Sequence, residues 1–274
     1  GLVSYYDSTN DDLKLVHCLN VTCSQYDAPV ILDSDGDVGA STSLAIGGDG
    51  LGLITYYGRD VKDLKMAHCS NISCSEATIT SPDRDNDMGQ YASLAVGIDG
   101  MGIVSYYDAT NKNLKVAHCS NAHCSEATII NPDSVGDVGL YTSIAITQDG
   151  FPMVSYYDAT NDQLKVLSCT NIDCSSFSKN IPDTSGGLYT SATFGSDGNP
   201  IFSYYDVTNG NLKVIHCGDS KCNSHGAILI DGGGAAGTSS YPSSITIGAD
   251  GLPLIAYYDT TTTGLKVAHC ANVF

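Results

Sequence analysis

A pair of adjacent tyrosines recurs six times along the chain at intervals of 48 to 53 residues, and this repeat constrains the fold more than any other feature. The pairs are Tyr5-Tyr6, Tyr56-Tyr57, Tyr106-Tyr107, Tyr156-Tyr157, Tyr204-Tyr205 and Tyr257-Tyr258. A Leu-Lys dipeptide follows every pair, and an Asp-Gly dipeptide precedes five of them. Self-similarity at a fixed period is typical of repeat architectures, so each repeat should be one supersecondary unit.

The repeat over residues 141–190 contains four segments that favour β-strands. Residues 142–147 alternate in polarity and precede a tight Asp-Gly turn, and residues 152–158 are rich in β-formers. Residues 164–169 predict a third strand and residues 177–181 a weaker fourth. The connections are too short for crossover helices, so neighbouring strands should pair antiparallel. Four such strands in about 50 residues predict an all-β fold, a β-propeller with one blade per repeat.

The chain begins at the second strand of one repeat and stops after the third strand of another. This gives 22 expected strands in a single domain over residues 1–274. The repeat boundaries are about 1–40, 41–90, 91–140, 141–188, 189–240 and 241–274. We expect six blades with the two terminal blades incomplete. A five-bladed ring and a slice of a longer array are the alternatives.

Composition excludes two classes of partner. The formal net charge is -18, with 12 basic and 30 acidic residues, so the basic footprint of a nucleic-acid-binding protein is missing. No run of 18 apolar residues is present to span a membrane. All the acidic residues except Glu76 and Glu126 are aspartates, which favour turns over helix interiors and agree with an all-β chain.

Ten of the eleven cysteines form Cys-x4-Cys pairs just after the third strand of a repeat. The pairs are Cys18/Cys23, Cys69/Cys74, Cys119/Cys124, Cys169/Cys174 and Cys217/Cys222. Pairs repeated at one place in each unit predict local disulfides, and these predict an extracellular or cell-surface protein. Cys270 is unpaired in this chain, and its partner would lie at position 275, which suggests a truncated or continuing chain.

Zinc is the rival explanation of the cysteines, because a histidine precedes the first cysteine of most pairs. These histidines are His17, His68, His118, His216 and His269. Each repeat offers only three ligands, and adjacent residues of a strand point to opposite faces, so disulfides are favoured. His123 and His225 fall outside the pattern and receive no role. Asn20 and Asn71 begin glycosylation sequons inside the cysteine loops.

Two loops carry alternating carboxylates beside glycine, which are the hard oxygen ligands that suit calcium. They supply the candidate ligands Asp33, Asp35 and Asp37 and, one repeat later, Asp83, Asp85 and Asp87. The glutamate that closes an EF-hand loop is absent. The alternative is that these residues make turns between blades.

An aspartate follows five of the six tyrosine pairs, and Gly58 takes its place in the second repeat. Adjacent tyrosines face opposite sides of a sheet, so we expect one of each pair in the core between blades. Tyrosines left exposed could stack on sugars. The aspartate should cap the following turn and pair with the lysine of Leu-Lys.

The repeat resembles that of secreted and surface tandem-repeat proteins of bacteria. The matching residues are Ser143-Ile-Ala-Ile-Thr-Gln-Asp-Gly150, Pro152 to Asp158, Asn161 and Leu164-Lys165, with the cysteine-bearing segment His118-Cys119-Ser-Asn-Ala-His-Cys124 of a subgroup. The resemblance covers the whole chain and implies a β-propeller. It implies no catalytic residues, because most members have no assigned activity.

No nucleophile elbow, phosphate-binding loop or metalloprotease motif is present, and nothing singles out a pair of catalytic carboxylates. We therefore predict a non-catalytic extracellular module, structural or adhesive, with polymerisation through incomplete blades as a further hypothesis. Its partners would be copies of itself, surface proteins or glycans. The alternatives are a glycan-binding, lectin-like propeller and, ranked last, a polysaccharide hydrolase.

Overall fold

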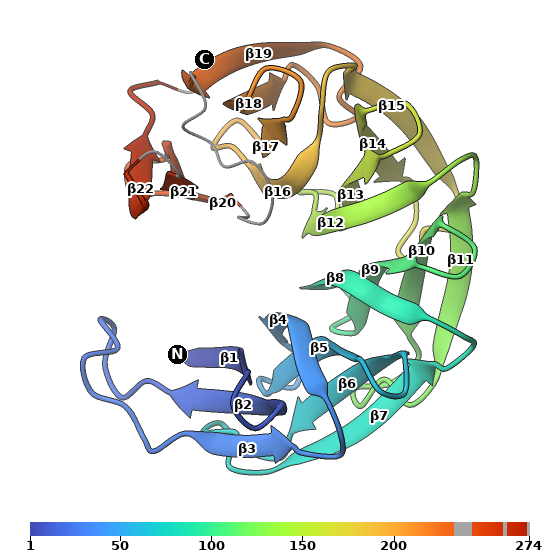
Figure 1. The fold of residues 1–274 in the computed structure, drawn as a ribbon, viewed down its shortest axis with the longest axis vertical. Coiled ribbons are helices and arrows are strands. Elements are labelled where there is room, and N and C mark those ends of the chain that lie inside the picture. The colour runs from blue at the N-terminus through green and yellow to red at the C-terminus, as the bar shows by residue number, and fades with distance from the viewer. Residues whose placement is uncertain (233–242, 260–261, 273–274) are drawn as a thin grey trace. The chain divides into compact units, whose positions relative to one another are not determined.

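The computed structural model describes residues 1–232, 243–259 and 262–272, which contain strands, turns and loops and no helix (Figure 1). The chain forms two compact units, Gly1–Asn131 and Pro132–Phe274. The expectation of a single domain stays a prediction. The expected boundary between the fifth and sixth repeats, at residues 240 and 241, lies outside the described residues.

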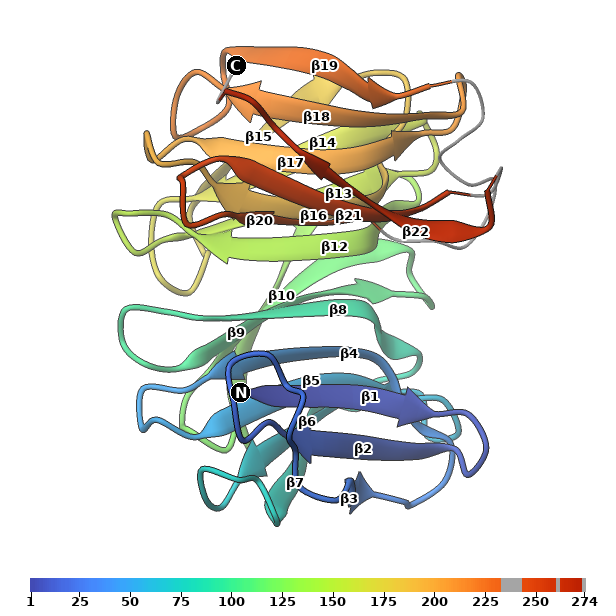
Figure 2. The same ribbon diagram turned by 90° about the vertical axis from the view of Figure 1, so that its left-hand side faces the viewer.

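The first unit contains three antiparallel sheets in chain order. The three-stranded sheet holds β1 (Leu2–Asp7), β2 (Asp12–His17) and β3 (Val30–Asp33). The next sheet holds β4 (Val38–Ile46), β5 (Gly52–Gly58), β6 (Asp63–Cys69) and β7 (Ala77–Asp83). The third holds β8 (Met88–Val96), β9 (Gly102–Asp108), β10 (Asn113–Cys119) and β11 (Ala127–Asp133), whose last two residues belong to the second unit. In the views of Figures 1 and 2, β1 lies beside β4, so successive sheets meet near their first strands.

The second unit repeats this organisation. Its sheets hold β12 (Val138–Ile146), β13 (Pro152–Asp158), β14 (Gln163–Cys169) and β15 (Phe177–Asp183), then β16 (Leu188–Phe194), β17 (Pro200–Asp206), β18 (Asn211–Cys217) and β19 (His225–Asp231). The last sheet holds β20 (Ser244–Ile247), β21 (Pro253–Asp259) and β22 (Gly264–His269). The described residues therefore contain the 22 strands expected from the repeat, in antiparallel sheets of three or four.

The predicted strands of the fourth repeat are confirmed, with one difference at the first strand. The strand begins at Val138 rather than residue 142, because two register shifts let it bulge between Val138 and Ser143 and then continue. Residues 138–141 were not predicted to belong to a strand. A bulge bends a strand and redirects side chains, and this feature matters for the site described below.

The core of each unit lies between neighbouring sheets. In the second unit Met153 and Val166 of one sheet pack with Phe202 and Tyr204 of the next, and all four are at most 1 % exposed. The first tyrosine of the pair is fully buried in four repeats, as expected for a core position. Strand faces that are apolar on both sides explain why the repeats stack. In the described part of the chain, no helix is long and apolar enough to cross a membrane.

Candidate functional site

A repeated aspartate–tyrosine–lysine cluster joins each sheet to the next. Tyr156 donates a 2.8 Å hydrogen bond to Asp133, and Lys165 and Lys179 each lie 3.0 Å from the same carboxylate. The same cluster recurs as Asp33–Tyr56–Lys65, Asp83–Tyr106–Lys115, Asp183–Tyr204–Lys213 and Asp231–Tyr257–Lys266. A group that recurs in five places and binds consecutive repeats together is structural.

This cluster accounts for two of the six candidate calcium ligands. Asp33 and Asp83 are buried against tyrosine and lysine, and each also accepts the backbone N–H two residues later, as turn-forming aspartates do. Among the described residues, no group of three or more histidine, cysteine or carboxylate side chains is arranged to hold a metal. Turn formation therefore explains Asp33 and Asp83, and calcium binding by Asp35, Asp37, Asp85 and Asp87 stays a prediction.

The aspartate that follows the tyrosine pair has the role expected from the sequence. Asp158 accepts the backbone N–H groups of Thr160 and Asn161 and lies 3.0 Å from Lys165. Burial acts to raise the pKa of Asp158, but hydrogen bonds from Asn161 and Lys165 outweigh it, so the pKa is lowered. Asp158 is therefore ionised near neutral pH and fixes the turn.

Four of the repeated histidines bind the aspartate of the Asp-Gly turn in their own repeat. The pairs are His68–Asp49 at 2.8 Å, His118–Asp99 at 2.9 Å, His216–Asp197 at 3.0 Å and His269–Asp250 at 2.8 Å. His123, which had no predicted role, packs its ring edge-on against His68 at 4.6 Å between centroids. His225 lines a pocket of about 410 Å³ together with His216 and Asp197.

The five predicted disulfides are all present. They join Cys18 to Cys23, Cys69 to Cys74, Cys119 to Cys124, Cys169 to Cys174 and Cys217 to Cys222. Cys270 is a free, buried cysteine. Five disulfides indicate folding in an oxidising compartment, and the zinc alternative is not needed to explain these cysteines.

The backbone at the second cysteine of each disulfide has a conformation that the sequence did not predict. Cys23, Cys74, Cys124, Cys174 and Cys222 have φ angles of 52°, 54°, 51°, 56° and 57°. The sequence predicted their pairing but gave no sign of this left-handed conformation, which glycine and asparagine usually adopt. The loop closes tightly here, because the N–H of Cys74 donates to the carbonyl of Asn71 at 3.0 Å. These cysteines are therefore turn residues as well as disulfide partners.

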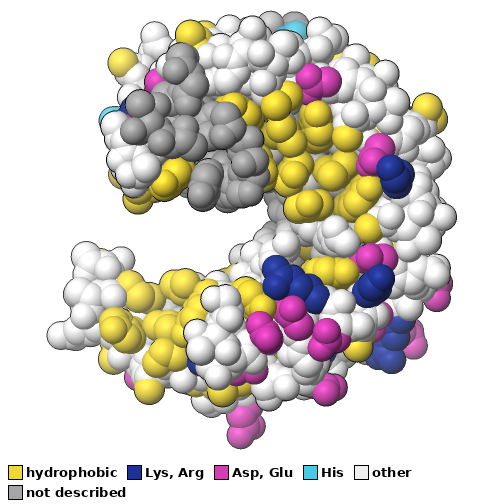
Figure 3. Space-filling model, viewed as in Figure 1, with side chains coloured by type: hydrophobic (Ala, Val, Ile, Leu, Met, Phe, Trp, Pro, Cys, Tyr) yellow, Lys and Arg dark blue, Asp and Glu magenta, His cyan; other side chains and the backbone are white. Residues whose placement is uncertain are grey.

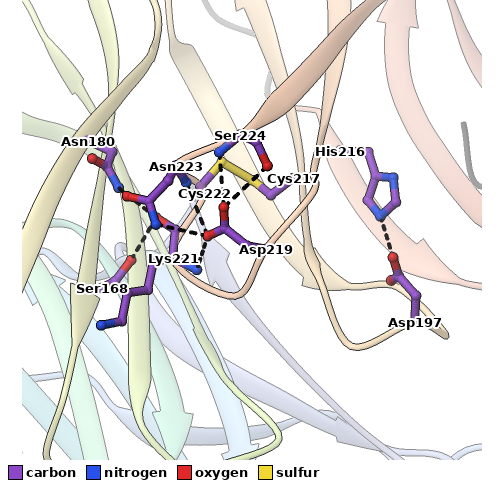
Figure 4. Close-up of a disulfide and its surroundings, with 10 residues drawn as sticks. All are labelled: Ser168, Asn180, Asp197, His216, Cys217, Asp219, Lys221, Cys222, Asn223 and Ser224. Atoms are coloured by element: carbon purple, nitrogen blue, oxygen red, sulfur yellow. Dashed lines mark hydrogen bonds and ion pairs between the residues drawn. A yellow bond between two sulfur atoms is a disulfide. The ribbon is translucent and has the colours of Figure 1, made fainter.

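One of the disulfide loops also contacts the preceding repeat. Figure 4 shows the Cys217–Cys222 loop, in which the carbonyl of Lys221 accepts hydrogen bonds from Asn180 and Ser168. Both donors belong to the sheet of β12 to β15. This disulfide therefore holds a loop that helps to join two neighbouring sheets.

The two sequon asparagines have a structural explanation. The side chain of Asn71 donates to the Ser75 hydroxyl at 2.9 Å and so closes the cysteine loop, and Asn20 does the same with Ser24. Asn121 makes the equivalent 3.0 Å bond to Ser125 although it lies outside any sequon. Loop closure therefore explains why asparagine stands at this position, and glycosylation of Asn20 and Asn71 stays a prediction.

The repeat symmetry breaks at one place that also forms a pocket. In the second repeat, Gly58 and Arg59 stand where the fourth repeat has Asp158 and Ala159. A Cβ atom at Gly58 would lie 2.9 Å from the Lys65 side chain, so an aspartate there would require that lysine to move. The pocket has a volume of about 290 Å³ and is lined by Ala40, Ser41, Tyr57, Arg59, Gln90 and Tyr91.

Strands from two neighbouring sheets position this pocket. Tyr57 lies at the end of β5, where it is nearly buried, and Arg59 follows two residues later and is exposed. Ser41 of β4 and Tyr91 of β8 each adopt a positive φ of 54° at a bulge. A residue with a side chain is strained there by roughly 1 to 2 kcal/mol.

Two carboxylates bind the residues that line the pocket. Tyr57 donates to Asp87 at 2.7 Å, and the Gln90 amide donates to the same carboxylate at 3.0 Å. Arg59 lies 3.5 Å from Asp37, and one carboxylate oxygen of Asp37 is buried without a hydrogen-bond partner among the described residues. On this face of the first unit, basic and acidic side chains lie side by side (Figure 3).

Arg59 and Tyr57 make further contacts with an aromatic ring and a carboxylate. Arg59 donates to the hydroxyl of Tyr6 at 3.1 Å, and its guanidinium lies 4.8 Å from the centroid of that ring. Burial, with the hydrogen bond to Asp87, raises the pKa of Tyr57 to about 12. Tyr57 is therefore a hydrogen-bond donor at every physiological pH. The pocket combines aromatic faces, planar polar groups and charges of both signs.

Arg59, Gln90 and Tyr91 were not predicted from the sequence as site residues. The departure at Gly58 was visible there, but the pocket also requires β8 to supply Gln90 and Tyr91. They could have been found by searching for a repeat in which several residues differ at once from the equivalent residues of the other repeats. Ser41 and Arg59 break the pattern in the same repeat.

No protein-family model matches the chain, and no curated protein matches it by sequence. Solved structures do share its fold. A Dyadobacter fermentans protein of unknown function has a TM-score of 0.65 and 10% identity, covering 98% of this chain and 92% of that one. α-L-arabinofuranosidase from Lactobacillus brevis has a TM-score of 0.51 and 11% identity, covering 84% and 90%. An exo-β-1,3-galactanase from Clostridium thermocellum has a TM-score of 0.52 and 10% identity, covering 85% and 59%.

These similarities identify an all-β, propeller-like fold and correct the functional expectation. The prediction of a non-catalytic structural or adhesive module is contradicted, because solved structures that share this fold include glycosidases. The prediction that the chain is not an enzyme is wrong on the same ground. Repetition of the motifs had suggested that no asymmetric site exists, whereas the pocket beside Arg59 is asymmetric among the repeats.

Proposed function

We propose that this chain acts on glycans and binds them in the pocket formed by Tyr57, Arg59, Gln90 and Tyr91. One observation carries the proposal: the pocket gathers aromatic rings and planar polar side chains where the repeat pattern breaks. A sugar ring has an apolar C–H face and a rim of hydroxyl groups. Aromatic rings suit the face, and amide and guanidinium groups suit the rim.

The charges favour a neutral glycan. Arg59 is balanced by Asp37, and Lys62 lies 3.8 Å from Asp87, so neither sign of charge is in excess around the pocket. The chain as a whole is strongly acidic, which disfavours long anionic polysaccharides. The similarity in fold to an arabinofuranosidase and a galactanase supports the same class of ligand.

Hydrolysis of a glycosidic bond is the reaction that we infer for this site. Most glycosidases use two carboxyl groups on either side of the scissile bond, one as an acid and the other as a base or nucleophile. Asp37 and Asp87 are the carboxylates that contact the lining residues, Asp37 through Arg59 and Asp87 through Tyr57. They are the pair through which the reaction would proceed.

Binding and cleavage can be tested separately. Titration calorimetry with neutral arabino- and galacto-oligosaccharides should give binding that Arg59→Ala weakens at least tenfold. Product analysis by chromatography should show cleavage that Asp37→Asn and Asp87→Asn abolish while binding persists. Failure of the folded protein to bind any member of a broad neutral glycan array would overturn the proposal. Binding without cleavage would retain the site and overturn the hydrolase.

We further infer that the six sheets are six blades, with three strands in the first and last. The repeated sheets, the shared fold and the described strands support this count. The five disulfides support an extracellular or cell-surface location. Localisation of the tagged protein in its source cells tests the second inference, and an experimental structure tests the first.

A further inference from the structure

One backbone position in the first strand of a sheet carries a tyrosine in three consecutive repeats and a serine in the repeat before them. The residues are Ser41, Tyr91, Tyr141 and Tyr189, and their φ angles are 54°, 54°, 53° and 54°. All four lie at the bulge of their strand, on β4, β8, β12 and β16. The backbone is therefore the same at each position, and only the side chain differs.

In the second unit this position forms a ring-on-ring contact between repeats. The ring of Tyr141 lies 4.3 Å from that of Tyr189, between centroids, and 6.4 Å from that of Tyr157 in its own repeat. The ring of Tyr141 thus occupies the space between β12 and β16, the first strands of two neighbouring sheets.

In the first unit the equivalent of Tyr141 is Ser41, and the equivalent of Tyr189 is Tyr91. A serine has no ring, and the pocket of about 290 Å³ lies there, lined by both Ser41 and Tyr91. This volume is at the lower end of the range of small-molecule sites, roughly 300 to 1,000 Å³. It is the size for one small ring rather than a long chain.

Two further departures around the pocket are polar, and a third, Ala40 in place of Leu140, is a smaller apolar residue. Arg59 stands where the second unit has Ala159, and Gln90 stands where it has Leu188. Three replacements that introduce polar groups, Tyr to Ser, Ala to Arg and Leu to Gln, therefore meet in one cavity, together with one change of Leu to Ala. Loss of a ring alone would leave an apolar hole, whereas these changes supply hydrogen-bonding groups to whatever fills it.

We propose that the pocket binds a single sugar residue of a neutral glycan, the terminal one. The sugar ring occupies the position that is equivalent to that of the Tyr141 side-chain ring in the second unit. The sugar ring stacks on Tyr91, and its hydroxyl groups bind Gln90 and Arg59. This inference rests on the proposed glycan function. It specifies the ligand as one sugar ring, which occupies the space that a tyrosine ring fills in the second unit.

The direct test fills the pocket with the side chain that the chain itself uses elsewhere. Ser41→Tyr should fold, because Tyr141 adopts the same φ in the same kind of bulge. Its denaturant midpoint should equal or exceed that of the wild type. Its affinity for the arabino- or galacto-oligosaccharide that the wild type binds, measured by calorimetry, should fall at least tenfold. Ser120→Tyr, the matched control, makes the same change at an exposed position of a cysteine loop outside the pocket lining, and it should bind within twofold of the wild type.

A second variant covers the case in which Ser41→Tyr does not fold. Arg59→Ala combined with Gln90→Leu removes the guanidinium and amide groups from the pocket and puts the second unit's residues at these two positions, and it should also lose at least tenfold in affinity. Wild-type affinity in folded Ser41→Tyr, or in the double variant, overturns this inference and leaves the glycan function standing. A wild-type protein that binds no neutral glycan overturns both.

Discussion

The hydroxyl of Tyr156 donates a 2.8 Å hydrogen bond to the carboxylate of Asp133, which lies 23 residues earlier in the chain and is 1 % exposed. Asp133 ends one sheet and Tyr156 belongs to the next, so this bond joins successive repeats. Its counterparts join the other repeats in the same way. The neighbouring Tyr157, by contrast, donates to Asp162 of its own repeat at 3.0 Å.

We expect Tyr156→Phe to lower the free energy of unfolding by about 2 kcal/mol, because it removes a hydrogen bond to a buried charged group. Tyr157→Phe is the matched control, and it should cost about 1 kcal/mol or less because its partner Asp162 is a turn residue nearer to solvent. Urea unfolding of both variants measures the difference. Equal costs would contradict the view that the first tyrosine joins repeats.

Stability should fall in acid. Burial acts to raise the pKa of Asp133 and of Asp206, but hydrogen bonds from lysines, Lys179 and Lys165 to the first and Lys213 to the second, help to lower both. A lowered pKa contributes stability that is present above the unfolded value, about 4, and is lost as pH falls through the folded value. The urea midpoint should therefore be constant from about pH 7 to 5 and drop below about pH 4. In the Asp206→Asn variant this drop should be smaller.

Stability should also fall in strong alkali. Burial, with a hydrogen bond to a carboxylate, raises the pKa of Tyr57 and of Tyr157 to about 12. A raised pKa contributes stability that is fully present below the unfolded value, about 10, and is lost as pH rises through about 12. Ultraviolet titration of the folded protein should show tyrosines that ionise only near pH 12, along with a falling unfolding midpoint. Complete tyrosine ionisation by about pH 10.5 without unfolding would be inconsistent with these contacts.

The disulfides should act locally and add to stability one by one. Each closes a loop between residues five apart, for which the chain-entropy model gives about 2 kcal/mol. Replacing Cys119 and Cys124 together by serine should lower the free energy of unfolding by about this amount, or by more because both side chains are fully buried. Cys270→Ser removes a buried thiol but no disulfide and serves as the control. A double variant as stable as Cys270→Ser would show that the disulfide contributes nothing.

The strands could be predicted from the sequence alone, because each of the six repeats carries β-forming segments and turn residues in the same order. The segments 152–158 and 164–169 form β13 and β14, because β-forming residues joined by a short polar turn favour an antiparallel hairpin. The bulge at Tyr141 could not be predicted, since a tyrosine at positive φ opposes local preference and is held by the surrounding sheets. The same holds for the left-handed backbone at Cys74 and Cys174.

The partners of Asp33 and Asp83 were also beyond local reasoning. Each carboxylate has neighbours in its own loop that resemble a calcium site, yet it binds a tyrosine 23 residues later. Arg59 was overlooked for a related reason. Its neighbour Gly58 marked the departure from the pattern, but the pocket exists only because β8 of the following repeat brings Gln90 and Tyr91 beside it.

A crystal structure of the protein soaked with a neutral arabino- or galacto-oligosaccharide tests the central claim most directly. We predict one sugar ring between Ser41 and Tyr91, with hydroxyl groups within hydrogen-bond distance of Arg59 and Gln90. A sugar bound elsewhere, for instance beside His216 and His225, with this pocket filled only by water, would contradict the account.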